Sequence, residues 1–169
     1  MEKLPPLRTR LRPIVPADVA ELKRGLIRLS PETRIKRFHA PVSQLTDAQW
    51  DYLTNVDGVD HVAYAACLEE AFEDAPPGAI VGVGRFIRDP KDPRIAEVAF
   101  VVHDNVQRRG IGRALRDAIR DAAIDRGVEF FRAHVLPSNL GMRRLLETPS
   151  LIRLGEREGA IDFRISRAA

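Results

Sequence analysis

The stretch Gln107-Arg108-Arg109-Gly110-Ile111-Gly112 is the most informative part of the sequence. It joins an apolar segment, Ile95 to Val102 (IAEVAFVV), to a segment whose apolar residues recur at helical spacing from Ile111 onward. The first amides of a helix have no partner inside it, and the helix dipole makes that end partially positive. Glycines allow the backbone to approach a ligand closely. The stretch therefore predicts an anion site suited to a pyrophosphate, to which Arg108, Arg109 and Arg113 add positive charge.

Two other phosphate-binding motifs do not fit this stretch. A Rossmann site needs G-x-G-x-x-G, and the third glycine position is Leu115 here. A P-loop needs G-x-x-x-x-G-K-[ST], which is absent from the sequence. Gly82 and Gly84 lie inside an expected strand, where they indicate a bulge or close packing. The alternative for residues 107–112 is an ordinary glycine-containing turn followed by a solvated arginine face.

The segments around this stretch predict a mixed sheet flanked by helices. Capping signals begin two of the expected helices, with Ser30-Pro31 at one and Thr46 to Gln49 as a capping box at the other. The acidic segment 69–78 ends in Pro-Pro-Gly and is expected to be a loop between strands. The helices are expected over 19–29, from 31, and over 46–53, 111–126 and 138–147. The strands are expected over 11–15, 59–68, 79–87, 95–102, 128–136, 151–154 and 160–166.

Composition restricts the classes of function. A length of 169 residues predicts a single domain, 1–169. The net charge is +3, and although there are 23 Arg and 4 Lys, aromatic residues are only 6%, so no nucleic-acid partner is expected. Cys67 is the only cysteine, which excludes an intramolecular disulfide and a cysteine-based zinc cluster. The His residues lack metal-ligand spacing, so no metal is expected. No 18-residue apolar run or signal peptide is present, which predicts a cytoplasmic protein without a membrane partner.

Gln107, Gly110 and Gly112 occupy the three fixed positions of [Q/R]-x-x-G-x-[G/A], and the stretch therefore resembles motif A of the GNAT superfamily of N-acetyltransferases. The clear resemblance covers residues 95–147. The LRP start, SPETRIKRF and VDHVAYAA are similar to the acetyltransferase domain of bacterial protein-lysine acetyltransferases. The resemblance implies an α/β (α+β) fold with a mostly antiparallel sheet of about six to seven strands. It also implies acetyl-CoA as co-substrate, an amine acceptor expected to be a protein lysine, and a monomer or homodimer.

The same resemblance assigns cofactor contacts. The backbone of Phe100, Val101 and Val102 would hold the pantetheine arm by strand-like hydrogen bonds. Asn139 would contact the pantetheine or a water on the base, or would simply cap the following helix. Arg143 would meet the CoA phosphates, unless it lies on a solvated face. The residues implied at the pyrophosphate are Gln107, Arg108, Arg109, Gly110, Ile111, Gly112 and Arg113.

Glu97 is the candidate catalytic base. It is the one charged residue in an apolar strand, where desolvation would raise its pKa toward neutrality. An amine near pKa 10 is mostly protonated at neutral pH and must lose a proton before it can attack. In the protein-acetyltransferase branch a glutamate at the matching strand position has this role. The alternative is that Glu97 reaches solvent at a splayed edge or pairs with an arginine such as Arg85.

Several alternatives remain open. Leu146 lies where the resemblance expects a tyrosine that protonates the leaving thiolate, which keeps a non-catalytic acetyl-CoA sensor module possible. A small-molecule amine is the alternative acceptor, and a closed apolar pocket would favour it over a protein lysine. The acidic residues of 69–74 would attract a basic target. His61 is a candidate second base, whereas His103 and His134 are expected to be structural.

Overall fold

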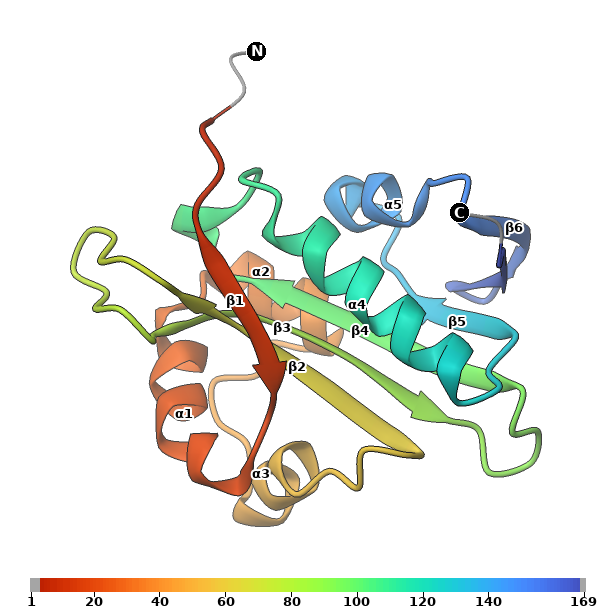
Figure 1. Ribbon diagram of the computed structural model, residues 1–169, viewed down its shortest axis with the longest axis horizontal. Helices are drawn as coiled ribbons and strands as arrows, with labels where there is room; N and C mark the ends of the chain where they lie inside the picture. The colour runs from red at the N-terminus through yellow and green to blue at the C-terminus, as the bar shows by residue number, and fades with distance from the viewer. Residues whose placement is uncertain (1–3, 168–169) are drawn as a thin grey trace.

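The computed structural model describes residues 4–167 and contains one seven-stranded sheet, in the order β1-β2-β3-β4-β5-β7-β6 (Figure 1). The β4–β5 pair is parallel and every other neighbouring pair is antiparallel. This confirms the expected mixed, mostly antiparallel sheet. The strands are β1 (Thr9–Pro13), β2 (His61–Leu68), β3 (Ile80–Arg88), β4 (Ile95–Val102), β5 (Phe130–His134), β6 (Leu151–Arg157) and β7 (Ala160–Ile165).

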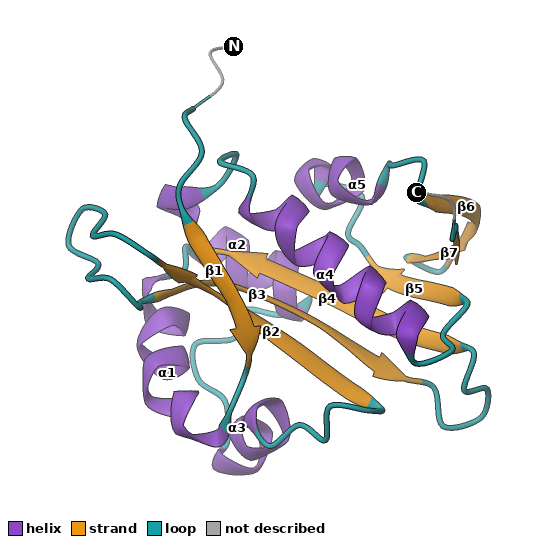
Figure 2. Ribbon diagram, in the orientation of Figure 1, coloured by secondary structure: helices purple, strands orange, loops and turns teal. Residues whose placement is uncertain are grey.

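Helices cover both faces of the sheet (Figure 2). Helix α4 crosses one face in front of β2, β3 and β4, and its Leu115 and Ile119 are fully buried there. Helices α1, α2 and α3 lie on the opposite face, where Leu26, Leu29 and Trp50 form a separate apolar cluster. The helices are α1 (Val19–Arg28), α2 (Pro31–Phe38), α3 (Asp47–Thr54), α4 (Ile111–Asp125) and α5 (Leu140–Leu146), with short 3-10 turns η1 (Pro16–Asp18) and η2 (Asp104–Val106).

The expected capping signals are present. The Ser30 hydroxyl accepts from the amide of Thr33 at 3.1 Å, and Thr46 and Gln49 form a reciprocal capping box at the start of α3. Gly127 has φ of +75° immediately after α4, as a helix C-terminus requires. Local side-chain chemistry therefore sets the ends of three helices.

Only one face of strand β4 is fully covered, although an almost continuous apolar run is typical of a strand covered on both faces. Ala96, Val98 and Phe100 are buried against α4, as a hydrophobic strand predicts. On the other face Val101 is half-buried beside α1 and α3, whereas Glu97 is exposed. The apolar run Ile95 to Val102 does not imply cover on both sides here, because α1, α2 and α3 shelter only part of the second face.

Gly82 and Gly84 serve close packing beneath α4. A Cβ on Gly84 would lie 2.9 Å from Cδ1 of Phe100, and one on Gly82 would lie 3.1 Å from Cδ1 of Leu115. The β2–β3 register also shifts between Ala66 and Cys67, next to the Ala66–Gly82 pair. None of the helices within residues 4–167 combines the length and apolar character needed to cross a membrane.

Candidate active site

The pairing between strands β4 and β5 ends at Glu97. The two strands pair at Ile95, Ala96 and Glu97, opposite Phe130, Phe131 and Arg132. Beyond that point β4 continues to Val102, but within residues 4–167 β5 supplies no further partner on that side. The backbone of β4 after Glu97 thus has one open edge, which includes the Phe100 to Val102 segment expected to bind pantetheine.

The open edge leads directly to the start of α4. Gly110 caps the helix with φ of +90°, a conformation that favours glycine. The first amide that bonds back into the helix is that of Ala114, to the Gly110 carbonyl at 3.0 Å. The preceding helical amides, from Ile111 to Arg113, therefore have no acceptor inside the helix. Nε2 of Gln107 donates to the Val102 carbonyl at 3.0 Å and ties the loop to the end of β4.

Gly112 lies next to the side chains of Leu145 and Val102. A Cβ at this position would come no closer than 3.5 Å to Leu145 of α5 and 3.8 Å to Val102 of β4. These are ordinary van der Waals distances, so packing does not require a glycine here. Its side-chain direction points into the gap between β4 and α5, where a ligand on the helix amides would lie.

The arginines expected at the pyrophosphate differ in how free their side chains are. Arg109 donates to the Pro5 carbonyl at 3.1 Å, and its guanidinium carbon lies 4.9 Å from the ring centroid of Phe72. Arg143 makes two hydrogen bonds to Glu156, at 3.1 and 2.6 Å. Arg113 is exposed in the first turn of α4. The roles of Arg108, Arg109, Arg113 and Arg143 toward a phosphate stay predictions, with backbone amides as the donors common to the site.

Asn139 has the capping role that was the alternative to ligand contact. It is buried, and its Oδ1 accepts from the amide of Met142 at 3.1 Å. A contact with a ligand through its remaining groups stays a prediction. Leu146, at the position where a tyrosine is expected, is 1% exposed and packs in the main core. That position contributes neither a hydroxyl nor solvent access.

Glu97 is not desolvated, contrary to the expectation from its apolar neighbours. Its side chain is 56% exposed, and Oε2 lies 3.8 Å from Nε2 of His134. The expectation that Glu97 is buried in an apolar strand is therefore wrong, because this face of β4 is open to solvent where the pairing with β5 ends. Arg85 does not pair with Glu97 either, since it bonds to Leu53 and His61.

His134 joins Glu97 because of the parallel register. Arg132 pairs with Glu97, and His134 follows two residues later on the same face of β5. The ring of His39, just after α2, lies 6.5 Å from the ring of His134. An open cluster of one carboxylate and two imidazoles thus forms where the strands separate. From sequence His134 is expected to be structural, and only the strand pairing indicates this contact.

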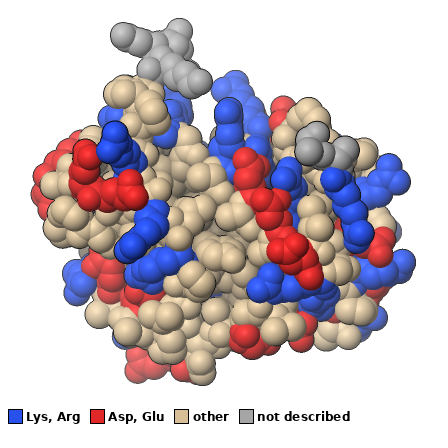
Figure 3. All heavy atoms as spheres, in the orientation of Figure 1, with Lys and Arg blue, Asp and Glu red and all other residues tan. Residues whose placement is uncertain are grey.

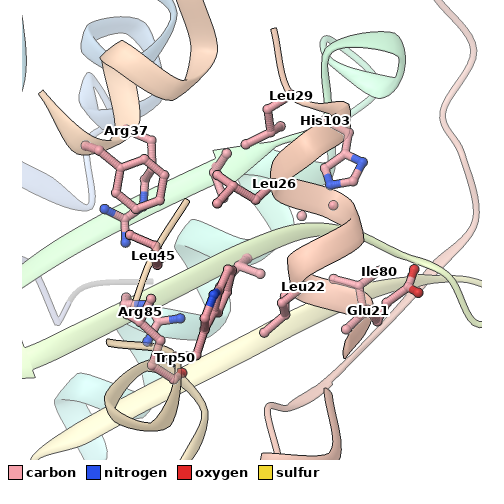
Figure 4. A pocket seen from close by; sticks show the side chains of 16 residues that line it. Glu21, Leu22, Leu26, Leu29, Arg37, Leu45, Trp50, Ile80, Arg85 and His103 are labelled. Carbon is pink, nitrogen blue, oxygen red and sulfur yellow. Dashed lines mark hydrogen bonds between the residues drawn. The ribbon is translucent and has the colours of Figure 1, made fainter. Parts of the chain in front are cut away.

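A cavity lies beneath α1, α2 and α3 (Figure 4). Its walls are mainly leucine, valine and Trp50, and its volume is about 70 Å³. Arg37 and Arg85 line one end, and Glu21 and His103 line the opposite end. Burial and the neighbouring Arg85 lower the pKa of His61 to about 4. His61 is therefore a weakly basic neutral imidazole whose Nε2 bonds to Arg85, and its role as a second base stays a prediction.

The acidic segment 69–74 lies beside residues 105–109, which lead into α4. The side-chain amide of Asn105 donates to Glu73 at 2.6 Å, and Phe72 stacks with Arg109. Basic and acidic side chains are interspersed over the face that carries α4 (Figure 3). Residues 4–167 hold no group of three or more His, Cys, Asp or Glu side chains placed to bind a metal.

Residues 29–148 match the model of the acetyltransferase (GNAT) family. The chain is 34% identical over 151 residues to acetyltransferase Pat of Mycolicibacterium smegmatis, a match that covers 89% of this chain and 43% of that protein. It thus spans about two fifths of the length of this curated relative. The GNAT domain of S. lividans PAT superposes with a TM-score of 0.79 at 28% identity, covering 93% of this chain and 89% of that one. For yncA of Salmonella typhimurium, solved with its cofactor acetyl-CoA, the TM-score is 0.68 at 16% identity, with 96% of each chain covered, which shows a shared fold.

Proposed function

The chain belongs to the GNAT family of acetyltransferases, and on that premise we propose that it transfers an acetyl group from acetyl-CoA to a primary amine. The observation that carries the proposal is the open edge of β4 beyond Glu97, which leads to the unpaired amides at the start of α4. A pantetheine arm needs strand-like partners, and a pyrophosphate needs amide donors at a helix start. The two elements supply these groups in the order in which CoA would require them.

The fit for acetyl-CoA rests on residues of the loop and of β4. The amides from Ile111 to Arg113 would bind the pyrophosphate, and the absence of a side chain at Gly112 would let it approach them closely. Gln107 would hold the loop against the end of β4. The backbone of Phe100 to Val102 would bind the pantetheine, which places the thioester toward Glu97. The amides from Val98 to Phe100 would stabilise the negative charge that develops on the thioester oxygen.

Glu97 is proposed as the general base. The acceptor nitrogen loses a proton to Glu97, directly or through water, and its lone pair attacks the thioester carbon. The carbon–sulfur bond then breaks, and CoA leaves as a thiolate that takes a proton from solvent. Because Glu97 is open to solvent, water can carry the proton away, and His134 at 3.8 Å is placed to share it. Leu146 is not required in this scheme.

Two acceptor classes are proposed, each from a different observation. Similarity to acetyltransferase Pat favours a protein lysine, for which the exposed cluster around Glu97 gives room. The mainly apolar cavity beneath α1, α2 and α3 favours a small amine. The cytoplasmic location and the single N-acetyltransferase domain, 1–169, belong to the same proposal.

The first test is thermal unfolding with acetyl-CoA, with NAD and ATP as controls. A ligand present at about 100 times its dissociation constant stabilises a protein by about 2.7 kcal/mol. We expect a rise in Tm with acetyl-CoA alone. The second test measures release of the CoA thiol with a lysine peptide or a small amine as acceptor. Failure of acetyl-CoA to raise the Tm at millimolar concentration would refute the proposal.

A further inference from the structure

Two arginines share one end of the cavity under α1, α2 and α3 without a carboxylate between them (Figure 4). Arg85 comes from β3 and Arg37 from α2, and Figure 4 shows both guanidinium groups at the same end. The one acidic side chain among the cavity walls, Glu21, lies at the opposite end, where it pairs with Arg24 at 2.7 Å. This end of the cavity is therefore strongly positive and walled by apolar side chains.

Arg85 is only 4% exposed, and its partners are neutral. Its Nη1 donates to the Leu53 carbonyl at 3.0 Å and bonds to Nε2 of His61 at 2.8 Å. Its Nε is buried and has no hydrogen-bond partner among the described residues. A buried guanidinium without a carboxylate is unfavourable because its charge is neither hydrated nor paired. The unpaired Nε donor and the uncompensated positive charge of Arg85 therefore favour the binding of an anion at this end of the cavity.

Arg37 adds a second cation to the same place. Within residues 4–167 its side chain makes no hydrogen bond or ion pair, and its guanidinium carbon lies 4.9 Å from the ring centroid of Phe38. Desolvation lowers the pKa of Arg37, while the charge of Glu97 raises it. Burial and the charge of Arg37 lower the pKa of Arg85 to about 9, so Arg85 stays protonated at neutral pH. A carboxylate between them would satisfy both, since guanidinium groups bind carboxylates by paired hydrogen bonds.

The arginines face the same side of the sheet as the proposed base. Arg85 pairs with Ala99 across β3 and β4, and Ala99 is two residues from Glu97. Adjacent strands are about 4.8 Å apart and two residues span about 6.6 Å, so the two backbone positions are roughly 8 Å apart. A molecule with an amine and a carboxylate a few bonds apart can therefore reach Glu97 and the arginines together. A cavity of about 70 Å³ has room for a carboxylate and a few methylene groups.

We propose that Arg37 and Arg85 form a carboxylate-binding subsite and that the acceptor is a small amine that carries this carboxylate. The subsite orients the acceptor so that its amine meets Glu97 at the point where β4 and β5 separate. The identity of the occupant as an acceptor rests on the proposed acetyl transfer, whereas the affinity of the cavity for a carboxylate does not.

Trp50 provides a direct measurement because it is the only tryptophan in the chain and lines the cavity. The probes are 4-aminobutanoate, 5-aminopentanoate and 6-aminohexanoate, each compared with its own carboxamide, which has the same shape and no negative charge. Emission is titrated with and without CoA. We expect at least one carboxylate to bind about tenfold tighter than its carboxamide, a difference of ~1.4 kcal/mol.

Two variants and a control test the arginines. Arg37→Gln should abolish the preference for the carboxylate, and because the side chain of Arg37 makes no hydrogen bond its loss should not disturb folding. Arg85→Gln should do the same, with circular dichroism used to confirm the fold because Arg85 also holds Leu53 and His61. Arg120→Gln on α4, across the sheet, should behave as the wild type.

The outcomes separate this proposal from the proposed function. Equal affinity for carboxylates and carboxamides, no emission change with any carboxylate at millimolar concentration, or an unchanged preference in Arg37→Gln would each overturn the subsite. Acetyl transfer to a lysine peptide with no carboxylate preference would leave the acetyltransferase and remove the subsite. Carboxylate binding lost in Arg37→Gln, with no acetyl transfer to any amine, would leave the subsite and remove the proposed function.

Discussion

Gly112 offers a test in which stability and acetyl-CoA binding respond in opposite directions. The residue lies in the first turn of α4 with no other protein atom closer than 3.5 Å to a Cβ placed on it. An alanine there fits the space and has a higher helix propensity than glycine. A leucine has almost the same propensity, but its side chain must extend into the gap between Leu145 and Val102. That gap is where CoA is proposed to pass.

The magnitudes follow from these contacts. Glycine in a helix costs up to about 1 kcal/mol relative to alanine, so Gly112→Ala and Gly112→Leu should each raise stability by up to that amount. For a chain of this size the corresponding rise in Tm is roughly 2–4 °C. Gly112→Ala adds a single methyl group and should keep the acetyl-CoA affinity close to that of the wild type. Gly112→Leu should raise the dissociation constant at least tenfold, a loss of about 1.4 kcal/mol.

The assay combines two measurements on the same three proteins. Urea unfolding without ligand gives the intrinsic stability, and calorimetric titration with acetyl-CoA gives the affinity. Gly112→Ala is the matched control for Gly112→Leu, because both remove the same glycine. If Gly112→Leu is as stable as Gly112→Ala and binds acetyl-CoA as tightly as the wild type, CoA does not pass through this gap. A leucine variant that loses stability would instead show that the gap is closed in the free protein.

Three further predictions concern the base, the packing beneath α4 and a buried imidazole. Glu97→Gln should lower kcat by about 10²-fold or more in steady-state kinetics and leave the acetyl-CoA dissociation constant from calorimetry unchanged. The control, Glu129→Gln, should change neither quantity. A fully active Glu97→Gln variant would show that Glu97 is not the base. Gly84→Ala should destabilise the fold by about 1–3 kcal/mol in urea, because its Cβ would lie 2.9 Å from Phe100, and an unchanged stability would contradict that packing. Because the folded-state pKa of His61 is about 4 and the unfolded value is near 6.5, its stabilising contribution is complete above about pH 6.5 and is lost as the pH falls toward 4. His61→Gln should flatten the pH dependence of unfolding in that window, and an unchanged slope would show that another group causes it.

Much of the fold could be predicted from the sequence because its signals are local. The Ser30 cap, the Thr46 capping box and Gly127 mark helix ends through hydrogen bonds or backbone conformations that involve only neighbouring residues. The observed bounds of β4 agree with the sequence prediction at both ends, because an apolar run between two turns restricts where a strand can begin and end. The loop 107–112 was predicted to join a strand to a helix start for the same reason, and Gly110 has the positive φ that such a start favours here.

The environment of the side chains could not be predicted in this way, because it depends on strand pairing. Glu97 was expected to be desolvated by its apolar neighbours, yet those neighbours point to both faces of β4 and the face it occupies is open. His134 comes within 3.8 Å of Glu97 through the parallel β4–β5 register, which sequence periodicity does not reveal. Arg37 and His61 are likewise brought to Arg85 by packing between segments far apart in the chain.

In the proposed reaction β4 would contact the two substrates from different directions, because its side chains alternate between two faces while its backbone edge is separate from both. Its backbone edge after Glu97 would be free for CoA, because the pairing of β4 with β5 ends at that residue while β5 stays paired with β7. Its side chains on the α4 face, such as Val98 and Phe100, are committed to the core. On the other face, the side chain of Glu97 is exposed to solvent and that of Val101 lines the cavity. An acceptor held by Arg37 and Arg85, as proposed, would approach from a side-chain face, while CoA would lie along the backbone edge. The two directions meet at Glu97, so a carboxylate placed in the cavity would determine which amines can reach the thioester.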